Sequence, residues 1–149
     1  MRYDEQYMTD AFAAILEPGE NTLCPVYCTF KPTGFLKSAQ YVQTGFATFT
    51  DKGRLLTVRC TLTGNITSSF SIDNAVSFSA KRSAVFKQHV VDLIFKKNDE
   101  SSKKTHLRIQ IAPKAGNGFP NQSRNADALA AIVTENADSV RPEETVSEV

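Results

Sequence analysis

The sequence predicts a mainly β domain in which about seven antiparallel strands form a partly open barrel, with a short helix before them and a capping helix after them. The first observation is that apolar and polar residues alternate in short stretches between residues 22 and 112, with Gly, Asn and Asp turn signals between the stretches. The second is that apolar residues follow helical spacing near both ends of the chain. Curling the strands into a sandwich or a partly open barrel, with the last helix closing one end, reduces the exposure of the two edges that a flat sheet would leave.

The N-terminal stretch predicts a short amphipathic helix over residues 4–16, because Met8, Phe12, Ile15 and Leu16 recur at helical spacing. Pro18 and Gly19 end it. We divide the 149 residues into a helical lead-in (1–20), one folded domain (21–136) and an acidic tail (137–149) that we expect to be mobile. The apolar stripe of the first helix could be covered by a second copy of the chain, so Met8 and Phe12 are candidate oligomer-interface residues.

The clearest strand covers residues 54–62, where Leu56, Val58, Cys60 and Leu62 fall on the face that we expect to point inward. Asp51 to Gly53 form the turn that joins it to the strand before. The other predicted strands cover residues 22–30, 45–50, 66–72, 75–79, 89–96 and 104–112, the last with Leu107, Ile109 and Ile111 inward. A helix over residues 122–135 follows, with Ala126, Leu129, Ala130 and Val133 on one stripe.

Four stretches together carry a family resemblance: Leu16-Glu-Pro-Gly-Glu20, Phe49-Thr-Asp-Lys-Gly-Arg-Leu-Leu56, Phe70-Ser-Ile-Asp-Asn-Ala-Val-Ser-Phe78, and Phe119-Pro-Asn with the Ala-Leu helix after it. In order and spacing, residues 16–136 resemble the bacterial pleckstrin-homology-like (PH-like) and GRAM-like domains. The resemblance implies a PH-like barrel whose last helix closes one end. It fixes no activity, because this fold hosts lipid binding, peptide binding and oligomer assembly.

The chain shows no secretory signal, because its acidic start lacks a basic segment followed by an apolar run, and its three cysteines are unpatterned. We therefore expect a cytoplasmic protein with free thiols. On a strand, Cys24 and Cys28 would lie about 13 Å apart, too far for one zinc ion to bind both, so we interpret them as core residues. No metal site, cofactor or catalytic motif is predicted, and an enzyme would need a site assembled between subunits.

Basic residues are concentrated between Lys81 and Lys114, a segment with nine basic and three acidic residues. This segment could bind an anionic surface or a protein partner, and the candidate contacts are Lys96, Lys97, Lys103, Lys104 and Arg108. The alternative is that lysines on hairpins and edge strands only prevent aggregation. Phe35 and Leu36, beside Lys37, are a further candidate loop contact, or they fold over the barrel mouth.

These observations favour a non-catalytic binding or assembly module that associates with a protein partner or with itself. The totals of 17 basic and 16 acidic residues lack the positive field of a nucleic-acid-binding protein, so no nucleic-acid partner is expected. One alternative is peripheral binding of an anionic membrane through the basic hairpin. However, the loop over residues 31–41 offers only Lys31 and Lys37, which argues against phosphoinositide binding. The other alternative is a carrier of a small lipid-like molecule inside the barrel.

Overall fold

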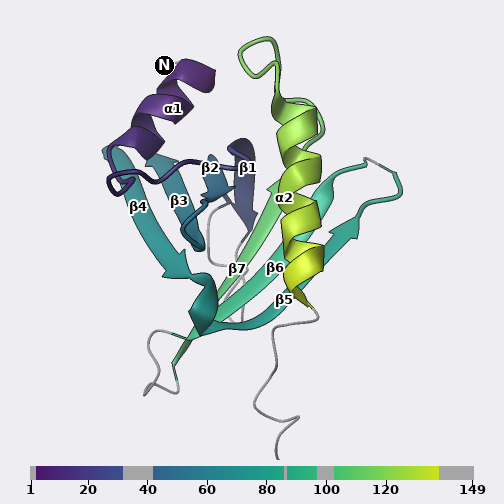
Figure 1. Cartoon of the computed structure of the whole chain (residues 1–149). Helices are drawn as coiled ribbons and strands as arrows, with labels where there is room; N and C mark the ends of the chain where they lie inside the picture. Colours follow the sequence, from purple (N-terminus) through teal and green to yellow (C-terminus); the bar gives the residue numbers. More distant parts are fainter. Residues whose placement is uncertain (1–2, 32–41, 86, 97–102, 138–149) are drawn as a thin grey trace, which may run out of the picture.

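A computed structural model describes residues 3–31, 42–85, 87–96 and 103–137. All seven strands form one antiparallel sheet, in the order β4-β3-β2-β1-β7-β6-β5, and a helix lies at either end of the chain (Figure 1). The elements are α1 (Glu5–Ala13), β1 (Val26–Lys31), β2 (Gln43–Phe49), β3 (Arg54–Thr61), β4 (Gly64–Ser71), the 3-10 turn η2 (Ile72–Asn74), β5 (Ala75–Arg82), β6 (His89–Lys96), β7 (Lys104–Ile111) and α2 (Gln122–Ala137). The predicted mainly β architecture with two flanking helices is confirmed.

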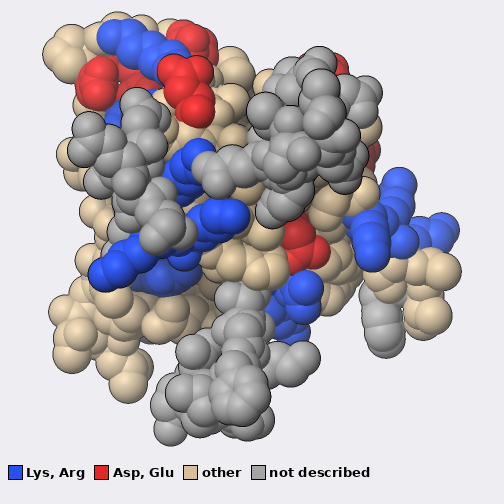
Figure 2. Space-filling view, turned by 90° about the horizontal axis from the view of Figure 1, so that it is seen from below, with Lys and Arg blue, Asp and Glu red and all other residues tan. Residues whose placement is uncertain are grey.

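The sheet bends strongly but does not close into a barrel, because its edge strands β4 and β5 are not paired with each other. Side chains from its two halves nevertheless meet inside the bend. The rings of Phe70 and Phe95 stack with centroids 5.0 Å apart, and those of Phe49 and Phe78 lie 6.1 Å apart. Figure 2 shows the molecule from below, where several Lys and Arg side chains gather on one face.

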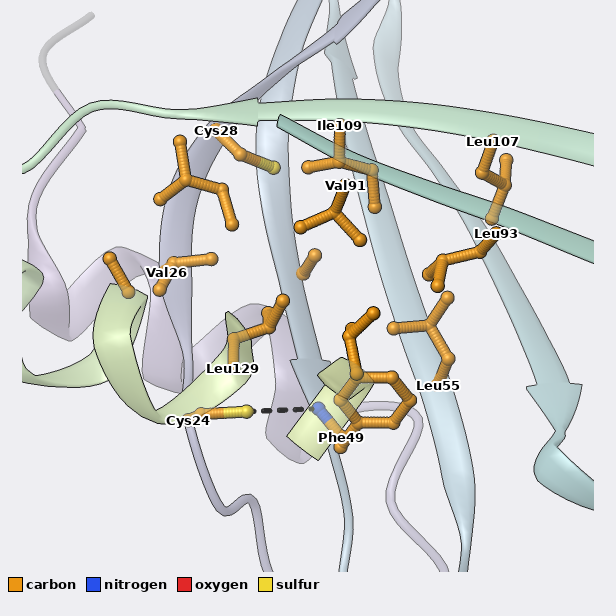
Figure 3. Close-up of a cluster of buried hydrophobic side chains, with 14 of the residues drawn as sticks. Cys24, Val26, Cys28, Phe49, Leu55, Val91, Leu93, Leu107, Ile109 and Leu129 are labelled. Carbon is orange, nitrogen blue, oxygen red and sulfur yellow. Dashed lines mark hydrogen bonds between the residues drawn. The ribbon is translucent and has the colours of Figure 1, made fainter. Parts of the chain in front are cut away.

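The inner core lies between the concave face of the sheet and α2 (Figure 3). The helix contributes the predicted stripe, and β7 contributes the predicted inward residues, so both patterns are confirmed. The buried residues are Ala126, Leu129, Ala130 and Val133 of α2 and Leu107, Ile109 and Ile111 of β7. Cys24 and Cys28 are also buried here, and the Cys24 Sγ accepts a hydrogen bond from the Phe49 N–H at 3.4 Å.

A second cluster lies on the convex face, where α1 packs on β2 and β3. It consists of Met8, Phe12, Phe46, Leu56, Val58 and Phe119. The Asp4 carboxylate starts the helix by accepting the Tyr7 N–H at 2.8 Å. Because α1 covers this face, β3 is buried on both sides, with Leu55 in the inner core and Leu56 and Val58 under the helix.

The predicted facing of β3 is therefore wrong in part. Val58 and Leu107 were assigned to one core, whereas they lie in separate clusters on opposite faces of the sheet. Leu62, also predicted to point inward, follows the end of β3 and is fully exposed, while Cys60 is half-buried. The cause is that neighbouring residues such as Leu55 and Leu56 are both apolar, so alternation alone cannot say which face meets which partner.

Hydrogen bonds from Gln122, the first residue of α2, connect β1 to the end of β7 where the two strands diverge. Their direct pairing covers only Thr29 to Lys31 on β1. Beyond it, the buried Gln122 amide accepts the Tyr27 N–H at 3.0 Å and donates to the Tyr27 carbonyl at 2.8 Å and the Ala112 carbonyl at 3.0 Å. Gln122 thus replaces missing strand pairing with side-chain hydrogen bonds and fixes the start of α2 against the sheet.

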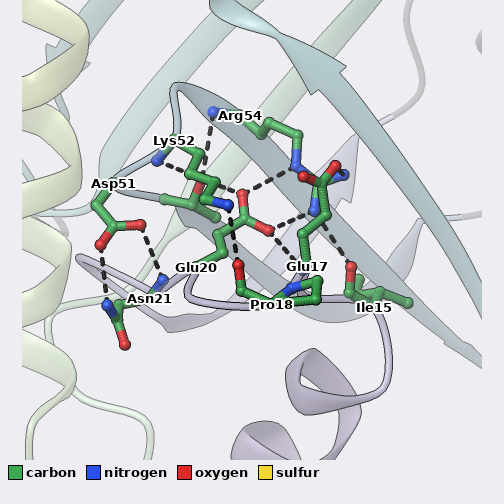
Figure 4. A network of polar contacts seen from close by, with 9 residues as sticks. Ile15, Glu17, Pro18, Glu20, Asn21, Asp51, Lys52 and Arg54 are labelled. Atoms are coloured by element: carbon green, nitrogen blue, oxygen red, sulfur yellow. Dashed lines mark hydrogen bonds and ion pairs between the residues drawn. The ribbon is translucent and has the colours of Figure 1, made fainter.

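A buried ion pair ties the lead-in segment to the β2–β3 hairpin (Figure 4). The Glu20 carboxylate receives the Arg54 guanidinium through Nε at 2.9 Å and Nη2 at 2.5 Å, and it also accepts the Thr50 hydroxyl at 2.6 Å. Arg54 donates in addition to the Ile15 carbonyl at 3.2 Å. The hydrogen bond from Arg54 outweighs the burial of the carboxylate and lowers the pKa of Glu20 to about 2.

The predicted tail from residue 138 onward lies outside the described residues. The helix before it continues through Ala137, slightly beyond the predicted end. Among the described residues, neither helix has the length and apolar character that crossing a membrane requires.

Candidate binding groove

The edge strand β4 is paired on one side only. All eight of its residues are in register with β3, from Arg54↔Ser71 to Thr61↔Gly64, and no described strand lies on its other side. The N–H of Ile72 donates to the Gly53 carbonyl, so Ile72 directs its backbone groups toward β3. In an antiparallel pair this direction alternates from one residue to the next. Thr67, Ser69 and Ser71 accordingly present their N–H and C=O groups to the open side.

In the part of the chain that the structure describes, this edge shows none of the usual protection against strand pairing. No charged residue and no proline occurs between Arg59 and Asp73. Most of β4 is exposed, and Ile66 is 52% exposed. An open, uncharged strand edge is a template on which another chain can form hydrogen bonds.

The opposite edge, β5, is protected in three ways. Its pairing with β6 is interrupted by an irregularity between Ala75 and Ser77, it carries Lys81 and Arg82, and α2 packs along it. Bulges, charges and a covering helix are the devices by which proteins block edge pairing. The contrast between the two edges singles out β4 as the available one.

A groove of about 480 Å³ runs beside β4, between that strand and the β6–β7 hairpin. The apolar side chains of Phe70 and Leu107 belong to it, and the remaining lining is polar or basic. Its full lining is Arg59, Ser68, Ser69, Phe70, Ser71, Asn74, Lys96, Thr105 and Leu107. The groove thus combines strand backbone, apolar surface and positive charge in one place.

Of the groove residues, the sequence analysis had predicted only Lys96 as a contact, and the charged residue that it missed is Arg59. It lies on β3 opposite Ile66, and its guanidinium carbon sits 5.1 Å from the centroid of the Phe30 ring. Its Nε is buried and has no hydrogen-bond partner within the described part of the chain. The ring below holds the cation by a cation–π contact, and one of its donors is unused.

The predicted basic hairpin is brought only in part to this groove. Lys96 lines it and lies opposite Lys104 in the strand register, and Lys103 and Lys104 are exposed. Lys97 lies outside the described residues. Arg108 instead forms an ion pair with Asp92 at 2.8 Å.

Asp92 also receives a hydrogen bond from His106 at 2.9 Å. Partial burial raises the pKa of Asp92, but the hydrogen bonds from Arg108 and His106 outweigh it and hold that pKa below its usual value. The charge of Arg108 is therefore largely compensated inside the protein, which weakens its case as a contact for an external anion.

The other candidate residues do not form an exposed site. Met8 and Phe12, proposed for an oligomer interface, are 2% and 1% exposed, because they pack on the sheet of their own chain. The apolar stripe of α1 is covered within the molecule, and the assignment of these two side chains to an interface between copies stays a prediction. Phe35 and Leu36 lie outside the described residues.

The three cysteines are free, and burial in the core raises the pKa of Cys28 most strongly. Within the described ranges, no three His, Cys, Asp or Glu side chains come together as a metal site would require. The predicted absence of bound zinc stays a prediction.

A scan against protein-family models finds no match, and neither does a search of curated proteins or of solved structures. The PH-like resemblance therefore stays a prediction, and a function has to be argued from the geometry of this chain.

Proposed function

We propose that this chain is a non-catalytic protein-binding module, with a fold of the PH-like kind, that binds an extended segment of a partner protein as an additional strand on β4. The observation that carries the proposal is the open edge of β4, which has one pairing partner and no charged side chain. Strand addition is a recurring mode of peptide recognition, in which main-chain hydrogen bonds supply affinity and neighbouring pockets supply specificity.

The dimensions of the edge set the size of the ligand. Eight residues in β4 offer an edge of about 27 Å at roughly 3.4 Å per residue, enough for a segment of similar length. Alternate side chains of that segment would point to the concave side of the sheet, where the groove lies, and the others to the convex side. The groove thus supplies the specificity pocket that this mode of recognition needs.

A partner protein fits this edge better than a second copy pairing through its own β4. The β4 sequence brings no acidic side chain to a groove that holds Arg59 and Lys96. A lipid-like cargo between the halves of the sheet is less favoured, because large side chains such as Phe49, Phe95 and Leu129 occupy that space.

The test uses Ser69, whose N–H points to the open side, so that Ser69→Pro removes one edge donor without breaking pairing with β3. The matched control is Ser69→Ala, which keeps the N–H. The probe is a displayed library of random eight-residue peptides. We expect selection on the unmodified protein to yield binders that lose affinity about tenfold or more for the proline variant and keep it for the alanine variant.

Failure to select any binder, or binders that are indifferent to Ser69→Pro, would overturn the proposal. Light scattering on the unmodified protein, Ser69→Pro and Ser69→Ala tests whether a second copy of the chain binds the β4 edge. A dimer that the proline variant alone dissociates would assign the edge to self-association in place of a partner protein.

A further inference from the structure

We infer that the groove beside β4 selects partner segments that carry an anionic side chain, a carboxylate or a phosphoryl group, and that Arg59 holds this group. The inference rests on the proposed function, because it assigns the chemistry of the segment that β4 would bind. It begins with Arg59, whose Nε is buried without a hydrogen-bond partner among the described residues.

The Arg59 Nε–H is costly to leave unpaired, because this buried donor has lost water and gained no hydrogen bond. The Phe30 ring, 5.1 Å from the guanidinium carbon, offers only its electron-rich face. An acceptor from outside the described chain would remove this cost. Guanidinium groups bind carboxylate and phosphoryl oxygens through short, charge-assisted hydrogen bonds.

The rest of the lining suits an anion. Lys96 adds a second cation, and neutral hydroxyl or amide groups come from Ser68, Asn74 and Thr105. Among the residues that the structure describes, no Asp or Glu lines the groove. The charged side chains that line the groove, Arg59 and Lys96, are therefore both cationic.

The position of Arg59 in the register says which part of the ligand it would meet. In the pairing of β3 with β4, Arg59 lies opposite Ile66, and Thr57 lies opposite Ser68. Directly opposite residues share a face of the sheet, so Arg59 and Ser68 point to the concave side together. A strand added to β4 would turn every second side chain toward that side, and one anionic side chain there would meet the groove.

The experiment compares four synthetic peptides that share the sequence of a selected binder and differ at one groove-facing position, which carries Glu, phosphoserine, Gln or Lys. Binding is measured for the unmodified protein, for Arg59→Met and for Lys104→Met. Methionine keeps the apolar contact with Phe30 and removes the charge. Lys104 is an exposed lysine outside the groove lining and is the control for general loss of positive charge.

We expect the Glu or the phosphoserine peptide to bind about tenfold more tightly than the Gln peptide, and the Lys peptide to bind most weakly. Arg59→Met should abolish the difference between the anionic and Gln peptides, whereas Lys104→Met should keep it. Arg59→Lys should retain part of it, because lysine supplies a charge without the planar donor fork. Thermal melts of each variant show whether the fold is intact.

Equal binding of the Glu, phosphoserine and Gln peptides would overturn the inference, while the proposed function would stand provided that Ser69→Pro still blocks them all. If no peptide of any charge binds, both are rejected. Vesicles containing phosphatidylserine are the last arm. If the vesicles bind in a way that depends on Arg59 and none of the peptides binds, the anion is a lipid headgroup, and the proposal of a partner protein is overturned.

Discussion

Replacing Glu20 with Gln should destabilise the fold in a way that depends on pH. The substitution keeps the shape of the side chain and removes its charge, which leaves the Arg54 guanidinium without the carboxylate that it binds through two hydrogen bonds. The Glu20 side chain is fully buried, and that of Arg54 is 20% exposed, so water compensates only in part.

The size of the effect follows from the pKa of Glu20, which falls from 4.5 to about 2 on folding. A shift of that size corresponds to about 3 kcal/mol of folding free energy. Because the folded-state pKa is the lower one, this contribution is fully present above about pH 4.5 and is lost as the pH falls through about 2. In Glu20→Gln the contribution is absent at every pH.

The assay is urea denaturation of both proteins between pH 7 and pH 2. We expect the difference in unfolding free energy to be about 3 kcal/mol at pH 7 and to shrink toward low pH as the carboxylate of the unmodified protein is protonated. A difference under about 0.5 kcal/mol at pH 7, or one that does not change with pH, would refute the argument that this ion pair fastens residues 15–20 to the hairpin.

Two further predictions concern packing. Gly45→Ala should cost several kcal/mol in a thermal or urea melt, because a Cβ there would lie 1.9 Å from the Val58 carbonyl oxygen, whereas Gly53→Ala, with open space but a φ of +72°, should cost only about 1 kcal/mol. In the native protein, a thiol reagent should modify the half-buried Cys60 before the buried Cys24 and Cys28, and equal rates for the three would contradict the packing.

The strands were predictable because most have one apolar face, as β7 shows with Leu107, Ile109 and Ile111. β3 could be located but not oriented. Its apolar residues occupy both faces, and which face meets α1 depends on contacts between residues far apart in the chain.

The same limit applies to Met8 and Phe12, the candidates for an oligomer interface. Their spacing predicts an apolar helix stripe, and that stripe exists. The spacing cannot say whether the cover is a second copy or the sheet of the same chain. In the structure Phe46 of β2 belongs to the cluster that covers the stripe, and the centroids of the Phe46 and Phe12 rings lie 6.3 Å apart.

Arg59 was missed for a different reason. The sequence analysis weighed basic residues where they cluster along the chain, between Lys81 and Lys114, and Arg59 lies outside that segment. Its role depends on Phe30, Ser68 and Lys96, which come from three other strands. Only the fold brings these together.

The strand order also decides how the lysines of the β6–β7 hairpin should be interpreted. Lysines that prevent aggregation belong on an edge strand, where they make pairing with another chain unfavourable. β6 and β7 are interior strands of the sheet, so neither Lys96 nor Lys104 lies on an edge strand. Both lysines nevertheless lie beyond the stretches that are paired on both sides, because β7 pairs with β1 only at Arg108 to Gln110 and β6 pairs with β5 only up to Phe95. The strand that needs such protection, β4, has none, and Lys96 instead lines the groove beside it. The prevention of aggregation alone therefore does not explain this placement of charge, because it leaves the exposed edge of β4 uncharged.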